Sequence, residues 1–341
     1  MSGPTLADVA RAAEVSTATV SHALNGTGRL AESTRRRVRE VATTLGYGSQ
    51  RIPRAGRNLG VAVTTYAGSA WNFLEIPYFA RLLTTAAATA HAHGYALTIL
   101  PATCGAETPW HTLAVDGMLL LDSPTDDPVL RALRARGIPL VFDGRPVDPR
   151  PGDVWVDNDH TATTREVLGH LAASGARRIA LHAGYGDEHY TRVVTRTYEQ
   201  WCHERGKAPL LLTFDPYDAP GHGFDALFAA RACDAVYAVY DPGGRQVLAA
   251  AARHGLRIPD DLLLVCASED RAYADNDPPV STVTLHPETI AETAVTALIS
   301  RLSPTAPLPP SPGALAVPAT LHPRRSSRRR ARPGRTRPGD R

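Results

Sequence analysis

Between residues 59 and 266 the chain alternates short aliphatic runs with longer amphipathic segments, and this alternation constrains the fold most strongly. A first series of strands is expected at 59–64, 96–100, 116–121 and 138–143, with helices at 78–93 and 129–136. A second series is expected to place strands at 154–158, 178–182, 210–214, 234–239 and 262–266, with helices at 160–174, 190–205, 222–231 and 243–254. Such alternation is typical of parallel sheets covered by helices. The sequence therefore predicts an α/β body with two lobes.

The first 47 residues follow a different, purely helical pattern. A first helix is expected after Thr5, which can cap it together with Asp8, and a second helix after the cap Ser16. A third helix is expected at 34–45. Two helices joined by a tight turn match the helix-turn-helix plan, in which the second helix reads base edges in the major groove. The alternative is an ordinary helical hairpin at the start of a domain.

Charge is distributed unevenly along the chain. The net charge is +3 overall, but it is +5 over residues 1–58, −10 over 59–321 and +8 over 322–341. A basic head on an acidic body fits a protein that touches nucleic acid with one end only.

Several other classes of protein find no support in the residues. Cys104, Cys202, Cys233 and Cys266 lack metal-ligand spacing, so we expect no metal site. No Walker-type or GxSxG motif and no nucleophile–base set is present, so we expect neither catalytic residues nor a cofactor. Because no apolar stretch reaches about 18 residues and no secretory signal precedes the head, we predict a soluble, cytoplasmic protein without a membrane partner.

The runs TLADVARAAEVSTATVSHALNG (5–26) and TRRRVREVATTLGY (34–47) resemble the head of the LacI–GalR family of transcriptional regulators. Matching stretches continue at 115–121, 137–145, 154–184, 234–241, 254–270 and 278–295. The resemblance implies a sequence-specific DNA-binding regulator, usually a repressor, with a two-lobed, Rossmann-like body of the periplasmic-binding-protein type. It also implies a homodimer on a pseudo-palindromic, double-stranded operator.

The resemblance sets the expected domain organisation. We expect a DNA-binding domain at 1–47, a hinge linker at 48–58, an effector-binding and dimerisation domain at 59–302, and a tail at 303–341. Lobe one would comprise 59–154 and 281–302, and lobe two 155–280. The tail is rich in Pro and Arg, and we expect its last 20 residues, 322–341, to be disordered. They could attract phosphates or be a solvated tail without a role. The tail lacks leucine heptads, so a dimer is expected.

Candidate DNA contacts lie in the head and the linker. Thr17, Ala18 and His22 occupy the base-reading positions, where many relatives carry Arg at the position of His22. The remaining candidates are suited to phosphate or groove contacts, and they are Thr5, Ser16, Thr19, Ser21, Asn25, Thr34, Arg51, Ile52 and Arg54.

The linker departs from the family pattern. It contains Pro53 and Gly56, both poor in helix interiors, and Ile52 is its only bulky apolar residue. We therefore expect a weakened or non-intercalating hinge that relies on Arg–phosphate contacts. The alternative is a flexible tether that does not touch DNA.

A small-molecule effector, with a sugar or a nucleoside as candidates, is expected in the cleft between the lobes, at the carboxyl ends of the strands. The resemblance assigns it Tyr78, Phe79, Asp143, Asn158, Arg192, Arg196 and Asp241. Each of these could instead be a cap or turn residue. Val194 replaces the family's effector-binding Arg, with Arg192 and Arg196 as possible substitutes, Ser268 replaces an Asp, and Tyr240 replaces an Asn. These departures leave open a regulator that has lost effector control. A solute-binding protein would share the body but has no use for the head.

Overall fold

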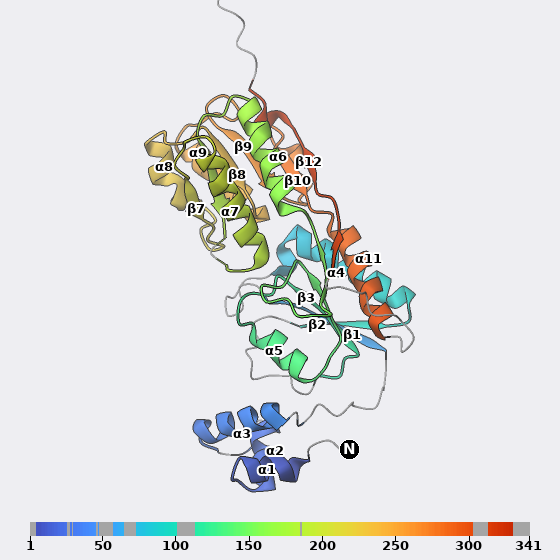
Figure 1. The fold of residues 1–341 in the computed structure, drawn as a ribbon. Helices are drawn as coiled ribbons and strands as arrows, with labels where there is room; N and C mark the ends of the chain where they lie inside the picture. The colour runs from blue at the N-terminus through green and yellow to red at the C-terminus, as the bar shows by residue number, and fades with distance from the viewer. Residues whose placement is uncertain are drawn as a thin grey trace, which may run out of the picture. The chain divides into compact units, whose positions relative to one another are not determined.

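The computed structural model describes residues 5–25, 28, 30–45, 47, 57–64, 73–100, 113–184, 186–302 and 313–329 (Figure 1). Contacts group the chain into two compact units, each built on one six-stranded sheet. The first unit includes residues 86–155, and the second includes residues 156–291.

The head consists of α1 (Leu6–Ala12), α2 (Thr17–Asn25) and α3 (Glu32–Leu45). Val9, Val20 and Val38, one from each helix, are fully buried and form the centre of its core. Thr5 caps α1 as expected, because its Oγ1 accepts the Asp8 N–H at 3.3 Å and Asp8 accepts the Thr5 N–H at 2.8 Å. The predicted three-helix head is confirmed.

The first sheet is made of β1 (Asn58–Val63), β2 (Ala96–Leu100), β3 (Gly117–Leu121), β4 (Leu140–Asp143), β5 (Val154–Asp157) and β11 (Gly313–Ala316), in the order β11-β5-β4-β3-β1-β2. The pairs of β1 with β2, β1 with β3 and β3 with β4 are parallel. The helices that follow its strands are α4 (Pro77–Ala92), after the short turn η1 (Phe73–Glu75), and α5 (Pro128–Ala135). β3 is buried along its whole length, as expected for an aliphatic run in the middle of a parallel sheet.

The second sheet has the order β12-β10-β9-β8-β6-β7. Its strands are β6 (Ile179–Ala183), β7 (Leu211–Thr213), β8 (Ala235–Ala238), β9 (Leu263–Ala267), β10 (Ser281–Thr284) and β12 (Thr320–His322). All its pairs are parallel except β10 with β12, which is antiparallel.

Helices cover both faces of this second sheet. The core on one face takes its helical residues from α6 (His160–Ala173) and α7 (His189–His203). The core on the other face takes them from η3 (His222–Phe224), α8 (Asp225–Ala229), α9 (Asp241–Arg253) and α10 (Ala272–Asp275). Alternate residues of β8 face the two cores, with Tyr237 on the first side and Val236 on the second. The predicted α/β body with two parallel-sheet lobes is confirmed.

The return of the chain to the first unit differs from the prediction. Residues 281–284 were expected in lobe one, but they form β10, which pairs with β9 in the second sheet. Val283 is fully buried in the core of that sheet, which explains the apolar run. The crossing falls within the next helix, α11 (Pro287–Leu302), since residues from 292 belong to the first unit.

The expected disorder of 322–341 is wrong for the described part of that segment. β12 adds an edge strand to the second sheet, and the turn η4 (Arg325–Ser327) follows it. Ser326 and Ser327 are fully buried, because their hydroxyls bond to groups of β9, β10 and α6. A segment rich in Arg and Ser can therefore be ordered by polar contacts without an apolar core. Residues 330–341 lie outside the described residues.

Candidate functional site

Asp241 stands at the start of α9, directly after β8, and the local sequence brings it close to the sheet. The first turn of α9 contains Gly243 and Gly244. A Cβ atom on Gly244 would lie 2.5 Å from the Tyr273 hydroxyl and 2.8 Å from the Cys266 sulfur. Only glycine lets the helix approach this closely, so the Gly pair sets the position of Asp241.

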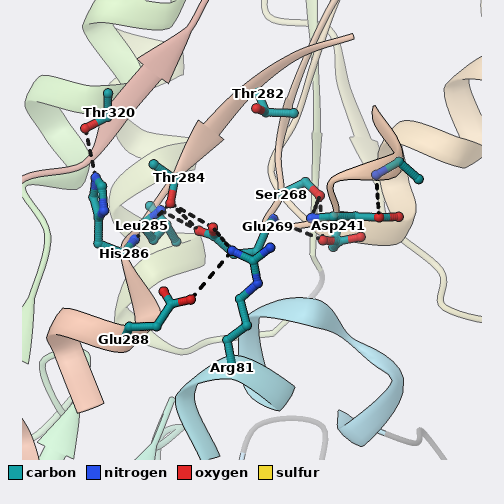
Figure 2. A network of polar contacts seen from close by, with 12 residues as sticks. Arg81, Asp241, Ser268, Glu269, Thr282, Thr284, Leu285, His286, Glu288 and Thr320 are labelled. Atoms are coloured by element: carbon teal, nitrogen blue, oxygen red, sulfur yellow. Dashed lines mark hydrogen bonds and ion pairs between the residues drawn. The ribbon is translucent and has the colours of Figure 1, made fainter. Parts of the chain in front are cut away.

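Asp241 is the centre of a buried polar network (Figure 2). Its Oδ2 accepts a hydrogen bond from the Ser268 hydroxyl at 2.5 Å and from the Glu269 N–H at 3.3 Å. The side chain is nearly buried, and burial raises the pKa of Asp241 to about 6. The replacement Ser268 is thus a direct partner of the expected ligand-binding carboxylate.

Glu269 extends this network toward α4 and α11, as Figure 2 shows. Its buried carboxylate accepts from the Thr284 hydroxyl, at 2.8 and 2.7 Å, and from the Leu285 N–H at 2.8 Å. Arg81 of α4 places Nη1 at 3.6 Å from Glu269 Oε2 and at 3.6 Å from Glu288 Oε1. This Arg81 pairing could not be read from the sequence, because Arg81 lies 188 residues before Glu269 and 207 residues before Glu288.

Asn158 has a structural role that the sequence did not reveal. Its Nδ2 donates to the carbonyl oxygens of Val317 at 2.8 Å and Leu285 at 3.2 Å. The buried amide therefore ties together segments that are far apart in the chain. These bonds are long-range, so they match neither a cap nor a turn, and the role of Asn158 in effector binding stays a prediction.

The remaining expected effector residues, Asp143, Tyr78 and Phe79, are buried to different extents. Asp143 ends β4 and is buried in the first unit, whereas Asp241 belongs to the second unit. Phe79 is buried in the first turn of α4, with its ring centroid 5.3 Å from that of the half-buried Tyr78 in an edge-on contact. Packing of this kind is common in cores, and it leaves part of Tyr78 accessible.

The proposed substitutes for the missing Arg lie on the outer side of α7. Arg192 and Arg196 are both exposed, and they project from the side of α7 opposite its buried residues. Arg192 pairs with Asp187 at 3.3 Å. Val194 faces the opposite way and is 1% exposed in the core. Both Arg side chains therefore point away from the side of α7 on which Val194 lies, and their role in effector binding stays a prediction.

Glu188 and Thr191, which the sequence reasoning missed, form a second polar cluster with Tyr240 at the start of α7. Glu188, just before the helix, accepts hydrogen bonds from the hydroxyls of Thr191 and Tyr240, the latter at 2.7 Å. Tyr240 is the neighbour of Asp241 in the chain. A carboxylate at a helix N-terminus was visible in the sequence, but nothing there indicated that it would be buried.

The second helix of the head presents three of the expected DNA contacts to solvent. Thr17, Ala18 and His22 are exposed, while Val20 and Ala23 on the other side of α2 are fully buried. Ser16 caps the helix as expected, because its Oγ accepts the Thr19 N–H at 3.1 Å. The hydroxyls of Ser16 and Thr19 also lie 2.8 Å apart, so they bond each other in the absence of DNA.

The other residues expected to contact DNA are partly buried, are bonded within the head, or lie outside the described residues. Ser21 and Thr34 are half-buried, and the Thr5 hydroxyl is bonded to Asp8. Arg35 of α3 is half-buried and donates to the Gly28 carbonyl at 2.6 Å. The Asn25 side chain and residues 51, 52 and 54 lie outside the described part of the chain. No prediction about Arg51, Ile52 or Arg54 is therefore tested.

The described residues contain no group of three or more His, Cys, Asp or Glu side chains that could hold a metal ion. Within the same residues, no helix is both long enough and apolar enough to cross a membrane.

Comparisons with known proteins agree with this architecture. Residues 5–50 match the model described as "Bacterial regulatory proteins, lacI family", and residues 168–327 match the "Periplasmic binding protein-like domain". The chain therefore joins a lacI-family head to a periplasmic-binding-protein-like domain. The second match ends at Ser327, the last residue of the buried η4 turn.

Relatives of this chain are named as transcriptional regulators. The repressor PurR of Aliivibrio fischeri is 28% identical over 87% of this chain and 91% of its own length. The regulator CelR of Thermobifida fusca is 28% identical, over 88% and 92% of the two chains.

Solved structures extend the likeness to three dimensions. The CelR–cellobiose complex is 26% identical, covers 95% of this chain and 99% of its own, and has a TM-score of 0.72. The lac repressor dimer bound to operator has a TM-score of 0.67 at 20% identity, over 96% and 100% of the two chains, and shows the shared fold.

Proposed function

We propose that this chain is a LacI-family transcriptional repressor that binds a pseudo-palindromic operator as a homodimer, and that a small molecule modulates its operator affinity. The observation that carries the proposal is the exposed row Thr17, Ala18 and His22 on α2, in a head joined to a periplasmic-binding-protein-like body. A repressor acts on DNA, so we place the protein in the cytoplasm.

The DNA-binding part rests on the geometry of α2. Thr17 offers a hydroxyl and a methyl group, Ala18 a methyl group, and His22 a ring that can donate or accept. Because Val20 and Ala23 are buried on the opposite side of α2, the side chains of Thr17, Ala18 and His22 all face solvent. One such helix reads only a half-site, so two copies on a two-fold symmetric operator provide the required specificity.

The effector part rests on Asp241 and its buried neighbours. A carboxylate held by Ser268 and the Glu269 N–H at the end of a parallel sheet is a common arrangement for binding polar ligand groups. A solved structure similar to this chain is named as a CelR–cellobiose complex, which supports a small polar ligand. The effector must bind the DNA-competent and incompetent states with different affinities to change operator occupancy.

A second candidate is a regulator without effector control. It is favoured by Val194, which is packed in the core, and by Arg192 and Arg196, which lie on the outer side of α7. A change of operator affinity on addition of any small molecule separates the two candidates.

The DNA-binding proposal is tested by selecting genomic fragments with the purified full-length protein and sequencing them. We expect an inverted repeat. His22→Ala should lower discrimination against a mutated half-site by about 1–3 kcal/mol while leaving non-specific affinity nearly unchanged. Thr44→Ala, at an exposed threonine of α3 that bonds only within its helix, is the control. Equal losses on random DNA would assign His22 to phosphate contact, and random fragments without a motif would refute the proposal.

A further inference from the structure

Glu188 is a buried acid whose position a helix cap does not explain. It precedes α7, yet its side chain makes no capping hydrogen bond to the helix backbone and is only 2% exposed. Instead the carboxyl group turns toward the hydroxyls of Tyr240 and Thr191, which both bond to its Oε1. Its Oε2 atom is buried and has no hydrogen-bond partner among the described residues.

No positive charge of the described residues compensates Glu188. It takes part in none of the ion pairs found among them, and the nearest arginine along α7, Arg192, is exposed and paired with Asp187. A buried carboxylate is destabilising unless it is paired or fully hydrogen-bonded. An unpaired oxygen of this kind in a binding protein is therefore a candidate for pairing with a ligand.

Aromatic rings lie beside this carboxylate. The Tyr240 ring stacks on Phe214, with centroids 5.1 Å apart, and meets the edge of Tyr190 at 5.9 Å. Tyr190 in turn lies 4.7 Å from the His160 ring. A carboxylate next to aromatic rings is an environment that favours an organic cation over an anion.

Asp241 contributes a further buried carboxylate. It follows Tyr240 directly in the chain, and its partner Ser268 offers a hydroxyl group. Hydroxyl groups of a ligand can bond to these oxygens. Val194 stands where the family resemblance places an effector-binding Arg, and Arg192 and Arg196 are exposed on the opposite side of α7.

We propose that the effector is a small polyhydroxylated molecule with a protonated amine, that is, an amino sugar, and that its ammonium group pairs with Oε2 of Glu188. Its hydroxyl groups bond to Asp241 and Ser268. This inference rests on the proposed function and deepens it, because it assigns the chemical class of the effector and the residue that selects it.

The experiment compares matched ligands by isothermal titration calorimetry on the full-length protein. The probes are D-glucosamine and D-galactosamine, each against the neutral parent sugar and the N-acetyl derivative. We expect an amino sugar to bind at least about tenfold more tightly than both neutral counterparts. In Glu188→Gln this preference should disappear. Glu199→Gln, which removes an exposed charge from the same helix, should keep the preference.

Each outcome decides the inference. If a neutral sugar binds as tightly as its amino counterpart, or if neither amino sugar binds at millimolar concentration, the inference is wrong. If Glu188→Gln does not fold, the comparison of ligands on the unmodified protein still decides. Operator binding is measured separately with the selected fragments, so an absence of DNA binding would refute the proposed function, whereas DNA binding without an amine preference would refute this inference alone.

Discussion

Replacing Ser326 with Ala should destabilise the second unit, although Ser326 lies in an Arg-rich segment that the sequence marks as disordered. Its Oγ accepts the Ser281 N–H at 2.8 Å and donates to the Leu264 carbonyl at 2.7 Å, and the side chain is fully buried. Alanine fits the same space but leaves both backbone groups without this partner.

The magnitude follows from these two groups. A buried donor or acceptor left unsatisfied costs about 1–3 kcal/mol, so we expect a loss of about 2–4 kcal/mol in the free energy of unfolding. With an m value of about 2 kcal/mol per M urea, a loss of about 3 kcal/mol lowers the unfolding midpoint by about 1.5 M.

The assay is urea unfolding followed by circular dichroism. Ser300→Ala is the matched control, since that serine is exposed on α11 and bonds only to the Thr296 carbonyl of its own helix. The control should shift the midpoint very little. If Ser326→Ala shifts it no more than the control does, the η4 turn is not held as described and the reasoning fails.

Three further predictions concern the capping box, the buried Asp and the Arg81 pairs. Thr5→Ala removes the capping box of α1, so the protection of the α1 amides against hydrogen exchange should fall by about 1 kcal/mol. Burial raises the pKa of Asp241 to about 6, against an ordinary 3.8, so the folded protein favours the protonated carboxyl group. The stability that this protonation contributes is fully present below about pH 3.8 and is lost as the pH rises through about 6. Asparagine does not titrate, so the stability of Asp241→Asn minus that of the unmodified protein should increase by up to about 3 kcal/mol from about pH 4 to about pH 7, measured by thermal unfolding. A stability difference that does not change with pH would contradict the burial argument. Glu269→Ala should destabilise by about 2–4 kcal/mol because it leaves Thr284 and Leu285 without their acceptor, whereas Glu288→Ala, at a half-exposed partner of the same Arg81, should cost less than about 1 kcal/mol, both measured by urea unfolding.

The periodic segments were the parts of the fold that could be predicted. Strands buried on both faces, such as β3, need continuous aliphatic runs, and the helices of the head need apolar residues at helical spacing. Both patterns can be recognised from neighbouring residues in the sequence. The place where the chain returns to the first unit was not predictable in this way, because β10 would look the same in either sheet.

The residues of the candidate site also differ in whether the local sequence could reveal them. Asp241 was found because it follows a strand and precedes a helix, a position that local pattern and family resemblance both mark. Glu188, Glu269 and Arg81 were not found, since their significance depends on burial and on partners distant in the chain. Arg192 and Arg196 had the expected residue type, but the rotation of α7 turns them away from the core.

The sequence by itself determined a helix-turn-helix head, an α/β body and an uneven distribution of charge, because propensity, periodicity and charge are properties of neighbouring residues. Only the tertiary structure decided that the segment 322–329 is ordered, that Val194 belongs to the core and that Glu188 is a buried acid without a cation. Burial and pairing depend on the three-dimensional surroundings of a side chain. In this protein those surroundings determine which side chains of the site are buried and which are paired, and the residue types alone do not.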